Sequence, residues 1–345
     1  MHINRLRPFF FLLISCLPLK GLATGDDDVE KKKTISKSYT VTPEEKLKIE
    51  NSFGDVVIST WDKPEIKVDV EILVKSSTEE RAQDLLDEID VKENHDGNLI
   101  SYKTDVGNMG NDSRKNKNVN KTFHIDYKVY MPSANRLQLE NSFGKIILPD
   151  FNGEVNLTSK FGSLTTGRLL HVDVIDVEFG TASIGQVTNG KVTFKFDTES
   201  TIGKINGSVK LNSEFSSRVQ FVVDDDIEEL LINESYSTLR MVVDKEFSAG
   251  FEIHTSFGQF RNETGFAIGE KKDPDNDIGP RFDKDYTGKS GDGKAHIKIK
   301  SSFGTVKLTH VYENSGKKED KEDKDDDKDD DKDDNKDQKA GKEPA

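Results

Sequence analysis

Three groups of residues in this 345-residue chain are of types that could do chemistry: scattered histidines, a run of aspartates and one cysteine. No two histidines have the i, i+4 spacing of a zinc-binding helix, and no Gly-x-Ser-x-Gly elbow is present to hold a nucleophilic serine. The histidines considered are His95, His124, His171, His254, His296 and His310. We therefore expect no catalytic residue, no cofactor site and no metal site.

The aspartates lie in a segment, residues 270–292, that reads as a loop. Asp273, Asp275 and Asp277 resemble the start of a calcium-binding loop, but Ile278 stands where such a loop needs a glycine for its sharp turn. This excludes a helix–loop–helix calcium site. One enzymatic alternative stays open, because some polysaccharide-cleaving enzymes use β-helices with acidic clusters: a carbohydrate-active enzyme that works with Asp275 and Asp277.

The N-terminal residues have the layout of a secretory signal. Arg5 and Arg7 precede an apolar run from Phe9 to Leu19, and small residues follow around Ala23. The run is too short to span a bilayer as a stable anchor. We assign residues 1–24 to a signal peptide and expect an exported protein of the periplasm or cell surface.

Cys16 is the only cysteine, so no intrachain disulfide can form. The sequence "LISC" resembles a bacterial lipobox, in which Cys16 would carry the lipid of an outer-membrane lipoprotein. The apolar run continues past Cys16, which favours ordinary cleavage near Ala23. Both interpretations stay open, and we expect a membrane contact only if Cys16 is lipidated.

The net charge of the chain excludes one class of partner. The formal net charge of −14 repels phosphate backbones, so we expect no nucleic-acid partner. Residues 313–345 are rich in Lys and Asp and nearly free of apolar side chains, so they cannot bury enough surface to offset chain entropy. We predict a disordered acidic tail there.

The elements that would position any site are mostly strands. Between residues 35 and 135, segments such as "IKVDVEIL" and "FHIDYKVY" place apolar side chains at every second position. One segment has helical spacing instead and predicts a helix over 77–90, with Ser77 as N-cap and Glu80 completing a capping box. We interpret residues 25–135 as a β-rich region that caps the N-terminal end of the fold.

A corner made of a small residue, a Phe and a Gly recurs along the chain. "IENSFGDVVIST" at 49 returns as "LENSFGKIILPD" at 139 and "IKSSFGTVKLTH" at 299, with variants between them at spacings of roughly 18 to 21 residues. The corner residues are Phe53, Gly54, Phe143, Gly144, Phe161, Gly162, Phe179, Gly180, Phe257, Gly258, Phe303 and Gly304, and variants with Phe215 and Tyr236 lack the glycine.

A fixed short period of strand and corner is typical of a solenoid. We predict an all-β fold, a single-stranded, β-helix-like β-solenoid over 136–312, preceded by the β-rich region with its short helix. Each Phe would stack above the previous one and fill the interior. Each glycine would supply either a positive φ or a close backbone approach. A β-sandwich is the alternative, although it does not need one ring–glycine corner per period.

The signal peptide, "IENSFGDVVISTWDKPEIKVDVEI", the capped helix and the returning "SFG" corners through "YTGKSGDGKAHIKIKSSFGTVKL" resemble the putative-adhesin β-solenoid family of bacterial envelope proteins. The resemblance covers about residues 35 to 310. It implies an exported, non-catalytic solenoid and brings no catalytic residue with it. Many relatives carry Asn-Gly-Asp at the corner where this chain has Ser-Phe-Gly.

These observations predict a non-catalytic structural or interaction protein of the cell envelope, adhesin-like, that binds an envelope protein or glycan through its polar faces. Two alternatives remain, the carbohydrate-active enzyme and an accessory protein of an envelope-stress system. The sequence leaves the identity of the partner and the oligomeric state open.

Overall fold

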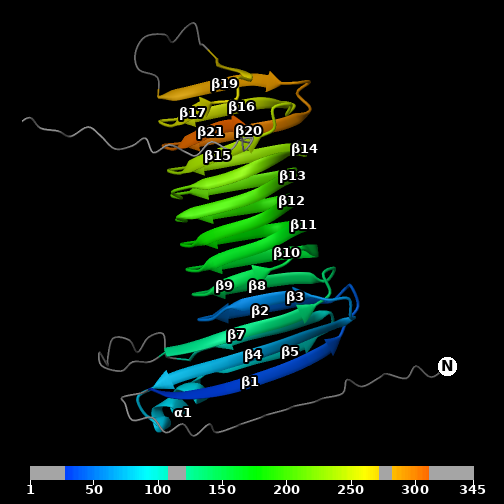
Figure 1. The fold of residues 1–345 in the computed structure, drawn as a ribbon, viewed down its shortest axis with the longest axis vertical. Helices are drawn as coiled ribbons and strands as arrows, with labels where there is room; N and C mark the ends of the chain where they lie inside the picture. Colours follow the sequence, from blue (N-terminus) through cyan, green and yellow to red (C-terminus); the bar gives the residue numbers. More distant parts are fainter. Residues whose placement is uncertain (1–27, 108–121, 272–281, 311–345) are drawn as a thin grey trace, which may run out of the picture. The chain divides into compact units, whose positions relative to one another are not determined.

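The computed structural model describes residues 28–107, 122–271 and 282–310. Within these ranges the chain is mostly β, with one short helix near the N-terminal end and a large mixed sheet rich in parallel pairs (Figure 1). All of these elements belong to one compact unit that ends at Val311.

The strands pair in two rows. In order of pairing, the first row consists of β5 (Asp90–Asp96), β6 (Leu99–Asp105), β2 (Lys46–Ser52), β8 (Arg136–Ser142), β10 (Phe151–Lys160), the second halves of β11 (Ser163–Glu178), β12 (Thr181–Lys195), β13 (Glu199–Glu214) and β14 (Val219–Ser235), and then β20 (Ala295–Ser302), β16 (Ala249–Ser256), β19 (Asp283–Ser290) and β18 (Ala267–Glu270).

The second row consists of β1 (Val29–Thr40), β4 (Glu65–Ser76), β7 (Thr122–Met131), β3 (Val56–Thr60), β9 (Lys145–Leu148), the first halves of β11 to β14, and then β15 (Thr238–Val243), β21 (Thr305–His310) and β17 (Gln259–Asn262). We call one first-row segment, the corner after it and the second-row segment that follows a coil. Figure 1 shows that strands β8 to β14 form successive coils that stack on one another.

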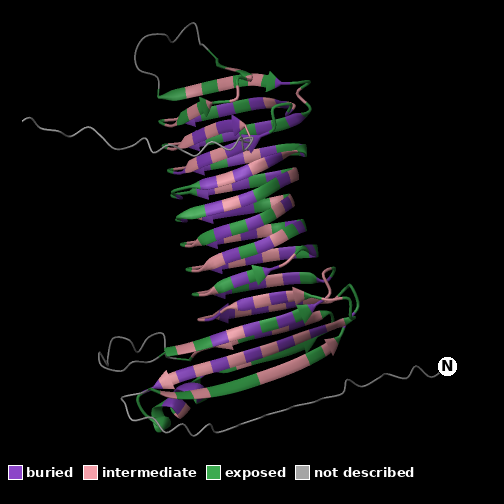
Figure 2. Ribbon diagram, viewed as in Figure 1, coloured by how far each residue is buried: buried purple, intermediate pink, exposed green. Residues whose placement is uncertain are grey.

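Side chains alternate between the inside and the outside of each coil, which is why the sequence alternates. Strand β10, for example, buries every second residue from Phe151 to Ser159 (Figure 2). Parallel pairing in register then places equivalent residues of successive coils directly above one another. Aliphatic columns run through the interior for this reason.

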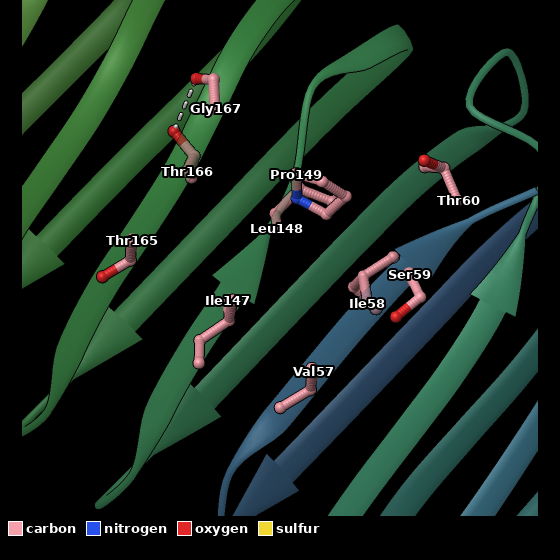
Figure 3. A pocket seen from close by; sticks show the side chains of 10 residues that line it. All are labelled: Val57, Ile58, Ser59, Thr60, Ile147, Leu148, Pro149, Thr165, Thr166 and Gly167. Atoms are coloured by element: carbon pink, nitrogen blue, oxygen red, sulfur yellow. Dashed lines mark hydrogen bonds between the residues drawn. The ribbon is translucent and has the colours of Figure 1, made fainter.

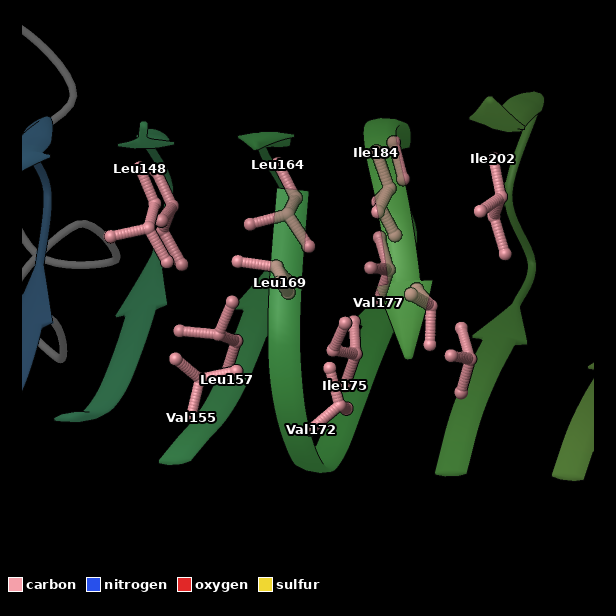
Figure 4. Close-up of a cluster of buried hydrophobic side chains, with 14 of the residues drawn as sticks. Leu148, Val155, Leu157, Leu164, Leu169, Val172, Ile175, Val177, Ile184 and Ile202 are labelled. Atoms are coloured by element: carbon pink, nitrogen blue, oxygen red, sulfur yellow. The ribbon is translucent and has the colours of Figure 1, made fainter. Parts of the chain in front are cut away.

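One such column joins Leu157, Ile175, Val192, Leu211 and Ile232, which are paired from strand to strand and at most 1% exposed. Figure 4 shows the interior around Leu157 and Ile175. Full burial of each such side chain stabilises the fold by about 1.5–3 kcal/mol. The core is therefore aliphatic, and a coil leaves it incomplete until the next coil covers it.

The helix α1 (Glu79–Glu88) packs against β1 and β4 through Ala82, Leu85 and Leu86. Its N-cap is Thr78, whose hydroxyl accepts a hydrogen bond from the Arg81 amide at 3.3 Å. The prediction of Ser77 as N-cap and Glu80 as its capping-box partner was therefore wrong by one residue. Thr78 has extended backbone angles and directly precedes the helix, so its hydroxyl accepts from the first-turn amide, whereas the Ser77 hydroxyl contacts only the Arg81 side chain.

The last coil breaks the order of the chain. Strands β20 and β21 lie between β14/β15 and β16/β17, so the final coil is inserted inside the stack. The expectation that each Phe stacks on the previous one in sequence is wrong here. The chain turns back through β19, which runs antiparallel along one edge of β16, and β20 then pairs with the other edge.

The loop predicted for residues 270–292 is also wrong at its C-terminal end, since β19 occupies Asp283–Ser290. This strand is polar because it lies near the end of the first row, where only the four-residue strand β18 follows it and most of its side chains stay exposed or half-buried. A strand with little burial does not show the apolar alternation that sequence analysis depends on. Three of the predictions fall outside the described residues: the aspartates Asp273, Asp275 and Asp277, the possible lipidation of Cys16, and the acidic tail.

Candidate functional site

The most unusual feature of the described residues is a ladder of aromatic rings at the corners between the two rows. The aromatic ladder comprises, in spatial order, Phe123, Phe53, Phe143, Phe161, Phe179, Phe196, Phe215, Tyr236, Phe303, Phe257 and Phe282. From Phe53 to Phe257, neighbouring centroids lie 4.8–5.2 Å apart and ring planes differ by only 2–7°. The spacing equals the distance between paired strands.

The ladder is not inside the coil. Phe161 is 49% exposed, Phe196 46% and Phe257 55%, and the other rings from Phe143 onward are exposed to a similar degree. The expectation that the rings fill the interior is wrong. The interior position of each corner lies two residues before the ring, where residues such as Asn141, Ser159 and Phe194 are buried.

Backbone conformation explains the outward direction. Nine ring residues, Phe53, Phe143, Phe161, Phe179, Phe196, Phe215, Tyr236, Phe257 and Phe303, have φ between 52° and 65°. A left-handed residue breaks the alternation of a strand, so the ring turns to the outside of the corner. The ring residue still pairs with the next coil, because the amide of Phe161 donates to the carbonyl of Glu178 at 2.9 Å. Strand pairing thus continues through the corner and fixes the spacing of the rings.

The glycines after the rings allow neighbouring coils to approach closely. None of the corner glycines has a positive φ, yet a Cβ at Gly162 would lie 1.9 Å from the carbonyl oxygen of Gly144. At Gly180 the same atom would lie 2.3 Å from the carbonyl oxygen of Gly162. Of the two roles predicted for these glycines, the structure supports the close backbone approach, and the positive φ falls on the aromatic residue.

Three rings of the ladder were not named from the sequence, although the interval of 36 residues between Phe179 and Phe215 indicated a degenerate copy in "FKFDTESTIGKI". Phe196 has the same conformation as its neighbours, but Asp197 follows it where a glycine was expected. Its spacings of 17 residues from Phe179 and 19 from Phe215 were the available signal. Phe123 lies on β7, which follows no Phe–Gly corner, and Phe282 directly precedes the antiparallel strand β19, so no repeat could reveal them.

The stacking decides which part of each ring a ligand can reach. Neighbouring rings cover both faces, so the exposed half of each ring is its edge. Sugars that stack on aromatic side chains need a free ring face, and within the ladder only the terminal rings keep one. Trp61 offers no free platform either, because Tyr130 stacks on it and the Lys63 ammonium lies 4.7 Å from its ring. The ladder is thus a narrow apolar ridge.

Polar residues border the ridge. The residues directly before the rings belong to the ends of the first-row segments: Ser52, Ser142, Lys160, Glu178, Lys195, Glu214, Ser235, Ser302 and Ser256. We call these the ladder flank. Its charges lie in four successive coils and alternate in sign, and Lys195 approaches Glu178 to 3.7 Å. The exposed apolar edges therefore have a locally neutral border.

Two buried carboxyl groups lie beneath corners that differ from the common pattern. Burial raises the pKa of Asp197 to about 6, although its carboxylate accepts hydrogen bonds from the Ser200 hydroxyl and the Gly180 amide. Burial also raises the pKa of Glu234, which accepts from the Ser237 amide at 2.6 Å and from the Ser301 hydroxyl. Each carboxyl group joins its own coil to a neighbouring one through hydrogen bonds from a serine hydroxyl and a backbone amide.

The described residues bring together little else that could do chemistry. An open depression of about 580 Å³ between β3, β9 and β11 is lined by aliphatic and hydroxyl side chains such as Ile147 and Thr165, without a titratable group (Figure 3). A second one near the C-terminal coil contains His296 and Asp292. Within the described ranges, no group of three His, Cys, Asp or Glu side chains could hold a metal ion, and no helix is long and apolar enough to cross a bilayer.

The histidines considered in the sequence analysis do not come together in the described part of the structure. His254 lies 2.8 Å from the carboxylate of Asp285, and His310 contacts the carbonyl oxygen of Thr264 at 2.9 Å. Both contacts join β-strands or their ends, and neither places the imidazole beside a hydroxyl or thiol nucleophile.

Comparisons with known proteins give structural neighbours at low similarity. No family model matches the chain, and no curated protein matches it. Among solved structures, a putative cell adhesion protein from Clostridium sporogenes covers 81% of this chain and 100% of its own, with 12% identity and a TM-score of 0.23. A putative adhesin from Bacteroides fragilis covers 81% and 97%, with 11% identity and a TM-score of 0.28.

A third neighbour, a putative lipid binding protein from Parabacteroides distasonis, covers 81% of this chain and 97% of its own, with 9% identity and a TM-score of 0.25. The chain is thus similar to proteins described as putative adhesins over most of its length. At these TM-scores the likeness carries no argument about a ligand, and the site has to be interpreted from its own geometry.

Proposed function

We propose that this chain is a non-catalytic interaction protein of the bacterial cell envelope, built as a β-solenoid, whose binding surface is the aromatic ladder. Export is inferred from the N-terminal residues, with the first 24 as signal peptide and Cys16 as an alternative lipid anchor. The proposal keeps the adhesin-like function expected from the sequence and moves the binding surface from the polar faces to the corners.

The observation that carries the proposal is the choice of an aromatic residue at nine left-handed positions. A non-glycine residue in this conformation costs on the order of 1–3 kcal/mol, and Gly or Asn would adopt it more easily. Stacking returns about 0.5–1.5 kcal/mol per pair. Folding alone therefore gains little from rings at these corners, and a role at the surface explains them better.

The size of the exposed apolar surface supports the same proposal. A Phe side chain offers on the order of 200 Å², so the nine ladder rings that are about half exposed, those from Phe143 to Phe282 in spatial order, present roughly 900 Å² in one continuous stripe. The largest apolar patch on a typical monomeric protein is about 300–600 Å² and is often functional. A stripe of this size favours an interaction surface over incidental exposure.

A matched pair of variants tests the proposal. Phe161→Asn/Phe179→Asn/Phe196→Asn removes three rings and keeps residues that tolerate the left-handed conformation. Thr165→Asn/Ser183→Asn changes outward polar positions of two of the same coils. Wild type and both variants would be immobilised and exposed to solubilised envelope proteins and glycans.

We expect the ladder variant to lose the retained components and the polar-face variant to keep them. Retention by the ladder variant, with loss in the polar-face variant, would return the binding surface to the polar faces. Turnover of a polysaccharide by the wild type would overturn the non-catalytic assignment.

A further inference from the structure

We propose that the aromatic ladder binds a second copy of this chain, with the two ladders facing each other in antiparallel directions about a two-fold axis. The inference rests on the proposed function, because it names the partner of the same surface. It is argued from the repeat distance, the exposed area and the charges of the ladder flank.

The repeat distance limits the class of partner that can follow the ladder along its length. The rings recur every 4.8–5.2 Å. An α-helix advances about 5.4 Å per turn, so its side chains drift out of step with the rings within a few turns. A second stack of paired strands has the same spacing. A second copy of this chain matches it along every coil.

The exposed area is sufficient for a stable pair. Roughly 900 Å² of ring surface on each copy sets an upper limit of about 1,800 Å² for the area buried between two ladders. Specific protein–protein interfaces bury about 1,200–2,000 Å² in total. Two ladders can therefore reach the standard size even if only part of each ring edge is covered.

The ladder flank is complementary to itself when the direction of the stack is reversed. In spatial order its four charges are Lys160, Glu178, Lys195 and Glu214. A two-fold axis between the Phe179 and Phe196 coils sets Lys160 opposite Glu214 and Glu178 opposite Lys195 of the second copy. Beyond these four coils, the same axis pairs Ser142 with Ser235 and Ser52 with Ser302. No like charges meet along this flank.

The flank charges also form pairs within one copy, such as Lys195 with Glu178, and Lys160 with Glu140 at 3.5 Å. Such partly exposed pairs contribute little to folding, about 0–1 kcal/mol. A purely intramolecular role therefore predicts that changes to the flank leave the association state unaltered. This difference makes the inference testable.

The experiment is analytical ultracentrifugation of the exported chain over a concentration series, with four proteins compared. We expect a monomer–dimer equilibrium for the wild type, and a dimer at least tenfold weaker for Phe161→Asn/Phe179→Asn/Phe196→Asn. Lys160→Glu alone should weaken the dimer by about tenfold, because it sets two carboxylates opposite each other. Lys160→Glu/Glu214→Lys should restore it. Circular dichroism of each variant establishes that it is folded.

A wild type that stays monomeric at every concentration would overturn the inference. If the ladder variant also fails to retain envelope components, the ladder then binds a foreign partner and the proposed function stands. A dimer that Lys160→Glu leaves unchanged, or that the double variant does not restore, would overturn the antiparallel arrangement. A dimer unaffected by the loss of three rings would place the interface elsewhere and remove the ladder from both proposals.

Discussion

Phe194 and Phe196 lie two residues apart at one end of β12 and have opposite environments. Phe194 is fully buried in the aliphatic interior, whereas Phe196 is 46% exposed and stacked between Phe179 and Phe215. The difference comes from the backbone, since Phe196 has a φ of 55° and Phe194 continues the strand. The same residue type thus serves as core on one side of a corner and as surface on the other.

The comparison shows that apolar character alone does not place a side chain in a β-stack. Interior positions are set by alternation along the strand, and one left-handed residue redirects the side chain. An interior ring gains from the removal of its whole surface from water. A ladder ring gains only from its two stacked neighbours, which leaves its edge available to a partner.

The largest expected effect separates these two rings directly. Phe194→Ala should lower the free energy of unfolding by about 3–5 kcal/mol, because it leaves a cavity in a closed interior. Phe196→Ala should cost about 1–2 kcal/mol, because it removes two stacking contacts from a surface ring. Urea denaturation of the two variants measures the difference. Equal losses would mean that the two rings have the same environment.

A glycine variant sharpens the comparison between corner backbone and corner side chain. Gly162→Ala places a Cβ 1.9 Å from the Gly144 carbonyl oxygen, and we expect a loss of about 3 kcal/mol because two backbone segments must separate. Gly250→Ala is the control, since its Cβ would meet no atom closer than 3.9 Å. Denaturation midpoints of the two proteins should differ clearly, and similar midpoints would contradict the close approach of the coils.

The corner at Phe196, where Asp197 stands in place of the glycine, should make stability depend on pH. Burial raises the pKa of Asp197 from 3.8 to about 6, so the folded protein binds a proton more tightly than the unfolded chain does. The contribution of this group is fully present below pH 4 and is lost as the pH rises through about 6. The upper limit is about 3 kcal/mol, since one pKa unit corresponds to about 1.4 kcal/mol.

Asp197→Asn removes this titration and preserves the shape of the side chain. The difference in unfolding free energy between variant and wild type should shift in favour of the variant between pH 4 and pH 7, by up to about 3 kcal/mol. Denaturation of both proteins at a series of pH values measures it. A constant difference across this range would show that Asp197 has the same pKa in the folded and unfolded chains.

The smallest expected effect concerns the left-handed conformation itself. Phe196→Asn and Phe196→Ala remove the same ring, but Asn tolerates a positive φ better than Ala does. We expect the Asn variant to be more stable by about 0.5 kcal/mol, as measured by denaturant midpoints at constant m-value. A more stable Ala variant would indicate that the backbone at residue 196 is not left-handed in solution.

Much of the fold could be predicted from the sequence, because periodicity records burial. The recurrence of Phe and Gly after alternating segments indicated one corner per coil, and the helical spacing of Ala82, Leu85 and Leu86 located the helix. Whether the rings face inward or outward could not be predicted, because a positive φ is ordinarily expected of the glycine and not of the Phe before it.

The order in which the coils stack could not be predicted from the sequence either. Nothing in the period distinguishes Phe257 from Phe303 as the neighbour of Tyr236, because every coil offers equivalent edges to the next one. Phe196 was not named because Asp197 follows it, whereas glycine or serine follows every other ring of the repeat. The polar strand β19 lacked apolar alternation because, near the end of the first row, most of its side chains stay exposed or half-buried.

The central claim is that the ladder faces outward while the residue two positions earlier faces inward. Thiol labelling of single-cysteine variants tests it most directly, in a Cys16→Ser background that removes the only natural cysteine. At concentrations too low for self-association, Phe179→Cys and Phe196→Cys should react at rates close to those of the unfolded protein, and Phe194→Cys should be strongly protected. Strong protection at positions 179 and 196 in the dilute protein would contradict the account, because the ladder would then be part of the core.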